Sequence, residues 1–203
     1  MVVIGLTGGI ASGKSTVSDM LSALGALIID TDKLSREVTL PGKPAWQEIV
    51  DRFGKEILDA DGQINRKCLG QIIFADSQAR TELERITHPR IEAEAMAVIN
   101  NAQRCACERV VLDAPLLIEV GWQNKVDVVW VVFVDEQVQL NRLIQRDNIS
   151  YEDAMARINA QLSLAEKLKY ADVVIDNSDS KEQTREQVIR AWNALRVVTS
   201  QYK

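Results

Sequence analysis

Residues 2–16 read VVIGLTGGIASGKST, which combines an apolar run of strand type, a glycine-rich turn and the first residues of a helical pattern. Within this stretch, residues 8–15 match G-x-x-x-x-G-K-[S/T], directly after the predicted strand and directly before the predicted helix. Glycines let main-chain N–H groups approach and face phosphate oxygens, and the N-terminus of the helix adds partial positive charge. The stretch therefore predicts a P-loop that binds a nucleoside triphosphate.

The side chains around this loop predict a magnesium-dependent site. Lys14 is expected to reach the β- and γ-phosphates, and the Ser15 hydroxyl to ligate Mg²⁺. Asp113 closes the apolar run Val110–Leu112, as a Walker B carboxylate does beside a P-loop, and is the second expected metal ligand. The predicted nucleotide-binding residues of the loop are Gly8, Ala11, Ser12, Gly13, Lys14, Ser15 and Thr16.

Five short apolar runs are of the kind expected for strands covered on both faces. Stretches with an apolar residue every three or four positions lie between them and indicate covering helices. The alternation predicts an α/β fold with a mostly parallel five-stranded sheet, whose ligands bind at the carboxyl ends of the strands. The five runs are Val2–Leu6, Ala26–Ile29, Val110–Leu112, Val128–Val134 and Val173–Ile175.

The second and third runs are about eighty residues apart, which is too far for a single crossover connection. The pattern from Cys68 to Ala106 is largely helical. We predict a helical insertion at 54–107, placed in a nucleotide-binding core made of 1–53 and 108–203. A second polar insertion at about 147–170, within the core, is predicted to be a mobile lid.

Composition and charge narrow the class of protein. Of 203 residues, 24 are Lys or Arg and 29 are Asp or Glu, and the net charge of −5 argues against nucleic acid as the main partner. The longest apolar run is far shorter than the roughly 20 residues of a membrane span, and Val2–Leu6 is too short for a signal peptide. We expect no membrane association and a cytoplasmic location. The sequence does not determine the oligomeric state, and a monomer is one of the possibilities. Reduced thiols are expected at Cys68, Cys105 and Cys107.

Two carboxylates follow the second predicted strand, in the sequence Asp30-Thr31-Asp32. One of them could cap a helix that begins at Lys33, which is a common use of Asp. The other could face the ligand and accept a proton from an attacking hydroxyl. We expect Asp32 to be this general base.

Residues 124–127 read NKVD and match the N-K-x-D motif with which GTPases read guanine. In a GTPase this motif follows a strand, whereas here it precedes Val128–Val134 and would lie at the opposite edge of the sheet. Residues 113–116, DAPL, also lack the glycine of a D-x-x-G switch. The context therefore disfavours a GTP-dependent switch.

Two further sets of residues have both a structural and a functional interpretation. Gln139, Arg142 and Arg146 share one face of a predicted helix, where they would form a solvated surface or close over a triphosphate. His88, which precedes Pro89, would be a structural residue or a ligand.

Seven motifs in register resemble the dephospho-coenzyme A kinase family, and together they run along nearly the whole chain. They are Ile4–Thr16, Asp30-Thr31-Asp32 with Arg36, His88-Pro89, Asp113–Leu117 with Glu119, Arg142 with Arg146-Asp147, Arg157-Ile158 with Gln161, and Ala171–Ile175 with Asn177.

This resemblance implies a transferase that uses ATP and Mg²⁺ to phosphorylate the 3′-hydroxyl of dephospho-coenzyme A, in the final step of coenzyme A biosynthesis. It implies a coenzyme A-binding role for the insertion at 54–107. Catalytic roles fall on Asp32, Lys14 and Arg142, nucleotide binding on Arg142, Arg146 and Asn177, and substrate binding on Asp32, Arg36, His88, Pro89 and Leu116. The alternatives are a nucleoside or nucleoside monophosphate kinase and, in another class, a nucleotide-dependent switch or binding module.

Overall fold

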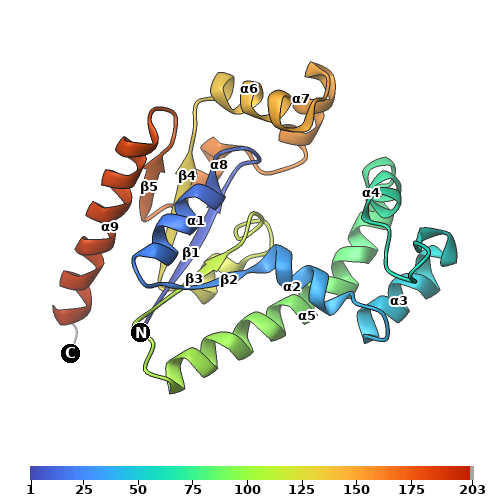
Figure 1. The fold of residues 1–203 in the computed structure, drawn as a ribbon, viewed down its shortest axis with the longest axis horizontal. Coiled ribbons are helices and arrows are strands. Elements are labelled where there is room, and N and C mark those ends of the chain that lie inside the picture. The colour runs from blue at the N-terminus through green and yellow to red at the C-terminus, as the bar shows by residue number, and fades with distance from the viewer. Residues whose placement is uncertain (202–203) are drawn as a thin grey trace. The chain divides into compact units, whose positions relative to one another are not determined.

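The computed structural model describes residues 1–201, with side chains described as far as Leu195. Strands alternate with helices along the chain (Figure 1). None of the helices in this range is both long and apolar enough to cross a bilayer. The elements are β1 (Val2–Gly8), α1 (Lys14–Ala23), β2 (Leu27–Asp30), α2 (Thr31–Val38), α3 (Pro44–Phe53), η1 (Lys55–Ile57), α4 (Arg66–Ala75), α5 (Ser77–Arg104), β3 (Arg109–Asp113), η2 (Trp122–Lys125), β4 (Val128–Phe133), α6 (Glu136–Asp147), α7 (Tyr151–Asn159), α8 (Leu164–Leu168), β5 (Val173–Asp176) and α9 (Lys181–Gln201).

The five strands form one sheet in the order β2-β3-β1-β4-β5. The central strand β1 runs parallel to β3, where Leu6 is opposite Asp113, and parallel to β4, where Gly8 is opposite Val132. β5 runs parallel to β4. The predicted parallel α/β sheet is confirmed, and its register brings the carboxyl ends of β1 and β3 to the same edge.

One face of the sheet packs against α1 and α9. The apolar residues Ile4 and Leu6 of β1 meet Val17 and Leu21 of α1 in a single core cluster that also contains Trp192 of α9. The Arg109 guanidinium of β3 lies over the Trp192 ring, 4.0 Å from its centroid. Burial of this apolar face, together with the cation–π contact, fixes α1 and therefore the start of the P-loop helix on the sheet.

The chain divides into two compact units. The sheet unit contains Met1–Ile29 and the chain from Ala102 onward, and the helical unit is Asp30–Asn101. The predicted insertion began at residue 54, whereas 30–53 group with the helices. The reason is packing, since Ile49 and Phe53 of α3 share a core with residues of α4 and α5 such as Leu69 and Ile86.

Candidate active site

The P-loop, residues 8–15, connects β1 to α1 through a left-handed turn at Gly13, whose φ is +85°. A Cβ atom on Gly13 would lie 2.0 Å from Asn177 Nδ2, so only glycine fits there. Gly13 is also the N-cap of α1, and no side chain caps that helix. Thr16 N already donates to Gly13 O at 3.0 Å, and the main-chain N–H groups of Lys14 and Ser15, at the very start of the helix, are left for an anionic ligand.

Three amide side chains hold the loop from outside. Ile10 N donates to Gln161 Oε1 at 2.9 Å, and Gln139 Nε2 donates to Ile10 O at 2.8 Å. Asn177 Nδ2 donates to Ser12 O at 2.8 Å. These contacts fix the main chain of residues 10–12, just before the turn at Gly13, so the loop is organised by the protein alone.

Ser12 places a hydroxyl inside the loop. The residue is 1% exposed, and within the described part of the chain its Oγ has no hydrogen-bond partner. Gly8 leaves room for it, since a Cβ on Gly8 would lie 2.6 Å from Ser12 Oγ. A buried hydroxyl of this kind can donate a hydrogen bond to an acceptor such as a phosphate oxygen.

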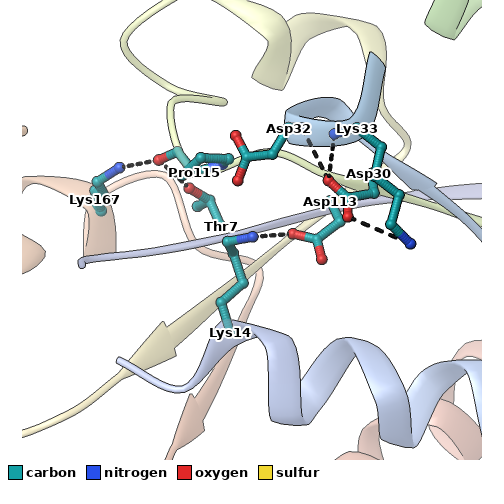
Figure 2. A network of polar contacts seen from close by, with 8 residues as sticks. All are labelled: Thr7, Lys14, Asp30, Asp32, Lys33, Asp113, Pro115 and Lys167. Atoms are coloured by element: carbon teal, nitrogen blue, oxygen red, sulfur yellow. Dashed lines mark hydrogen bonds and ion pairs between the residues drawn. The ribbon is translucent and has the colours of Figure 1, made fainter. Parts of the chain in front are cut away.

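Lys14 and Asp113 form an ion pair at the edge where β1 and β3 end (Figure 2). Their side chains are only 18% and 7% exposed, because the β1–β3 register places Asp113 beside the end of β1. The structure thus brings the predicted triphosphate-binding lysine and the predicted metal-binding carboxylate together. Ser15 lies in the first turn of α1 and is exposed.

The donor set around the P-loop fits Mg²⁺. A hydroxyl at Ser15 and a carboxylate at Asp113 are oxygen ligands, which Mg²⁺ prefers, and it commonly takes its remaining ligands from substrate phosphates and water. Within residues 1–201 no group of three or more His, Cys, Asp or Glu side chains forms an all-protein metal cage. The protein residues therefore suit a magnesium ion that arrives with a nucleotide.

A cavity of about 270 Å³ lies beside the start of α1. Arg142 of α6 borders it and donates from Nη1 to Asn177 O at 2.9 Å, while Asn177 Oδ1 accepts from Thr184 Oγ1 at 2.9 Å. Asn177 therefore joins the P-loop, α6 and α9. The residues that line the cavity are Gly13, Thr16, Arg142, Asn177, Asp179 and Lys181.

Arg146, one turn beyond Arg142, is held by a carboxylate. Its Nε donates to Asp147 Oδ1 at 2.7 Å, and Arg157 Nη1 of α7 donates to Asp147 Oδ2 at 2.7 Å. The hydrogen bond from Arg146 is the main cause that lowers the pKa of Asp147. Asp147 thus joins α6 to α7 of the predicted lid through Arg157, while Arg146, which was predicted to bind nucleotide, is paired with that same carboxylate.

The N-K-x-D sequence lies away from this edge. Asp127 Oδ2 accepts from the N–H of Val3 at 2.7 Å, where β1 begins. The structure thus confirms that the motif lies at the amino edge of the sheet, opposite the P-loop.

In the helical unit, Asp30 is the cap of α2. Its Oδ1 accepts from the N–H groups of Asp32 and Lys33 at 2.9 and 3.1 Å. The helix begins at Thr31, so the prediction that it begins at Lys33 was wrong. Asp32 therefore lies in the first turn of this helix, where it is exposed.

Arg36 lies one turn after Asp32 on α2, and sequence reasoning missed a third charged residue beside them, Arg66. Arg66 Nη2 donates to Thr39 Oγ1 at 2.8 Å. Burial lowers the pKa of Arg66, the positive charge of Arg36 lowers it further, and Asp32 opposes both. Two guanidinium groups thus act on one another near the predicted general base.

His88 and Pro89 lie within the long helix α5. His88 is half-buried, and its pKa is lowered mainly by that burial, with the Glu84 carboxylate acting in the opposite direction. The lowered pKa favours the neutral imidazole, which can accept a hydrogen bond at one ring nitrogen and donate one from the other.

The strand order, the P-loop after β1 and the carboxylate at the end of β3 define a nucleotide-binding protein of the P-loop kinase class. Residues 2–183 match the family model for dephospho-CoA kinase. The chain therefore belongs to the dephospho-CoA kinase family.

Individual relatives agree with this assignment. The chain is 50% identical over 187 residues to the dephospho-CoA kinase of Carboxydothermus hydrogenoformans, covering 92% of this chain and 91% of the relative. It is 50% identical over 192 residues to that of Geobacter metallireducens, covering 95% and 96%. Among solved structures, the dephospho-CoA kinase from Campylobacter jejuni is similar with a TM-score of 0.71 and 30% identity, covering 95% of this chain and 96% of that one.

Proposed function

We propose that the protein transfers the γ-phosphate of ATP to the 3′-hydroxyl of dephospho-coenzyme A and releases coenzyme A and ADP, in the final step of coenzyme A biosynthesis. The observation that carries the proposal is the P-loop with its Lys14–Asp113 ion pair, found in a chain that belongs to the dephospho-CoA kinase family. The organised loop supports phosphate binding, and the family supports the choice of acceptor.

ATP is held through the P-loop from Gly8 to Thr16. Main-chain N–H groups, the Ser12 hydroxyl and the Lys14 ammonium bind the phosphates, and Arg142 stabilises the charge that develops during transfer. The cavity beside Gly13 and Asn177 receives the nucleoside end. Arg146 contributes to the nucleotide site through its place on α6.

Ser15 and Asp113 hold Mg²⁺, which when bound neutralises charge on the β- and γ-phosphate oxygens. Lys14 and Asp113 neutralise one another in their ion pair. A bound magnesium nucleotide would offer each of them a partner of opposite charge, the phosphate oxygens for Lys14 and the metal ion for Asp113.

The acceptor is bound by the helical unit, where Asp32 accepts the proton of the attacking hydroxyl. Arg36, with Arg66 beside it, provides positive charge for an anionic substrate, and His88, Pro89 and Leu116 contact the acceptor. The segment 147–170 closes as a lid and excludes water, which would otherwise accept the phosphate.

A coupled assay of ADP release, with and without dephospho-coenzyme A, tests this function. We expect magnesium-dependent ADP release that requires dephospho-coenzyme A and gives a product phosphorylated at the 3′-oxygen. Preferred transfer to AMP, CMP or nucleosides would replace the proposal with a nucleoside or nucleoside monophosphate kinase. Tight ATP or GTP binding without acceptor-dependent release would indicate a switch or binding module.

Two variants separate the proposed roles in the same assay. Lys14→Ala is expected to remove most of the transfer, because the β/γ-phosphate contact is lost. Asp32→Asn is expected to leave ATP binding nearly intact and to lower kcat by about 10²-fold or more, because the base is lost. Unchanged turnover in Asp32→Asn would refute its role as the base.

A further inference from the structure

Lys167 of α8 is completely buried, although it carries an ammonium group and belongs to the segment predicted to form a lid. Its Nζ donates to Pro115 O at 2.7 Å and lies 2.9 Å from Glu119 Oε1. Both partners belong to the loop that follows β3. A buried lysine with this many directed contacts fixes the groups around it, since each contact has a defined geometry.

The loop after β3 is held from two sides. Pro115 O accepts from Thr7 Oγ1 of β1 at 3.1 Å as well as from Lys167, and both side chains point to this carbonyl in Figure 2. Glu119 Oε1 also accepts from the N–H of Leu162 at 3.1 Å. The loop between Asp113 and Glu119 is therefore tied both to β1 and to the base of the predicted lid.

Lys167 is also close enough to the P-loop to be affected by its charge. Burial is the main cause that lowers the pKa of Lys167, the Glu119 contacts oppose it, and the positive charge of Lys14 adds to the lowering. A buried ion pair contributes little to stability compared with apolar side chains of the same volume. The position of Lys167 points to a role in placing the catalytic groups.

We propose that Lys167 is a positioning residue for phosphoryl transfer, which fixes the loop after Asp113 and ties the base of the predicted lid to it. The inference rests on the proposed kinase function. ATP is bound by other residues, so loss of Lys167 acts on turnover more than on nucleotide affinity. It also loosens the lid base, so water reaches the transferred phosphate more easily.

The test compares Lys167→Met with Lys169→Met. Methionine keeps much of the volume of lysine without its charge. Lys169 serves as the control because its side chain is 65% exposed and is paired with Glu166 at 2.6 Å on the surface. In Lys167→Met we expect kcat to fall about tenfold or more, because small displacements of reacting groups are costly, while ATP affinity stays within about threefold. The share of ADP released without acceptor is expected to rise. Lys169→Met should match the unmodified chain in all three measurements.

Hydrogen–deuterium exchange on the chain without nucleotide gives a second readout. In Lys167→Met, the amide groups of residues 113–121 and 161–168 should exchange faster than in the unmodified chain, while those of β5 should exchange at the same rate. General destabilisation would instead raise exchange throughout the sheet unit. Glu119→Gln keeps a hydrogen-bond acceptor and should show the same changes to a smaller extent, which keeps the test valid if Lys167→Met does not fold.

The outcomes separate the two proposals. If the unmodified chain shows no acceptor-dependent ADP release, the proposed function fails, while the exchange measurement still tests the positioning role. If the unmodified chain is active and Lys167→Met behaves like Lys169→Met, the positioning role is overturned. Equal losses of ATP affinity and kcat, with faster exchange everywhere, would also overturn it.

Discussion

At the scale of single residues, Gly13 shows how packing and backbone conformation select the same amino acid. Its positive φ favours glycine, and Asn177 occupies the space where a side chain would begin. The Asn177 amide cannot move aside easily, because it is bonded to Ser12 O and to Thr184 Oγ1. The shape of the P-loop thus depends on a residue that is 165 positions away from Ser12 in the sequence.

The substitution Gly13→Ala tests this explanation against Gly25→Ala. Gly25 also has a positive φ, of +95°, but a Cβ atom there would meet nothing within 4 Å. We expect Gly25→Ala to lower the free energy of unfolding by about 1–2 kcal/mol and Gly13→Ala by about 2–4 kcal/mol, because only the second adds a clash. Urea unfolding measures both values, and equal losses would contradict the role given to Asn177.

At the scale of elements, the start of α2 depends on one carboxylate. Asp30 accepts from two main-chain N–H groups of the first turn, and Asp32 adds a negative charge to that same turn. The ion pair of Asp30 with Lys33 contributes little, because its atoms are 3.8 Å apart and the Lys33 side chain is 76% exposed. The cap therefore sets where the helix begins, and with it the place of Asp32.

We expect Asp30→Ala to lower the free energy of unfolding by about 0.5–2 kcal/mol, because the two N–H groups lose their acceptor. Asp30→Asn should stay within a few tenths of a kcal/mol of the unmodified chain, since Asn caps helices as well as Asp does. Denaturant unfolding followed by circular dichroism compares the two. An equal loss in both variants would show that the charge of Asp30, and not its cap, stabilises the helix.

At the scale of the whole molecule, His88, the one histidine of the chain, contributes to the way in which the stability changes with pH near neutrality. Burial lowers the pKa of His88 in the folded chain, below the value of about 6.5 that it has when unfolded. The unfolded chain therefore takes up the proton first as the pH falls. The stability that this residue contributes is complete above pH 6.5 and decreases as the pH falls toward the folded pKa.

Replacement of His88 by Gln should remove this dependence. Between about pH 7.5 and 5.5, above the range in which most carboxylates titrate, the free energy of unfolding should fall less steeply in His88→Gln than in the unmodified chain. The difference in slope stays below about 1.4 kcal/mol per pH unit, the limit for one proton. Denaturant unfolding at several pH values measures it, and parallel curves would exclude His88 as the cause.

Much of the sheet unit could be predicted from the sequence, because its signals are local. Apolar runs mark the strands, the glycine pattern marks the P-loop, and a carboxylate at the end of an apolar run marks Asp113. Once the strands are parallel, the carboxyl ends of adjacent strands meet, so the proximity of Lys14 and Asp113 follows. The dephospho-CoA kinase family was identified on the same local motifs.

Other features depend on contacts between distant parts of the chain, and neither periodicity nor motif spacing predicts such contacts. Gln139 and Gln161 hold Ile10 from 129 and 151 positions away, and a polar residue in a surface-like pattern gives no sign of this. The grouping of 30–53 with the helical unit follows from the core that α3 completes. Local sequence therefore determined the fold class and the nucleotide loop. Tertiary packing alone decided which side chains hold that loop and buried Lys167, because the environment of a side chain depends on the whole folded chain.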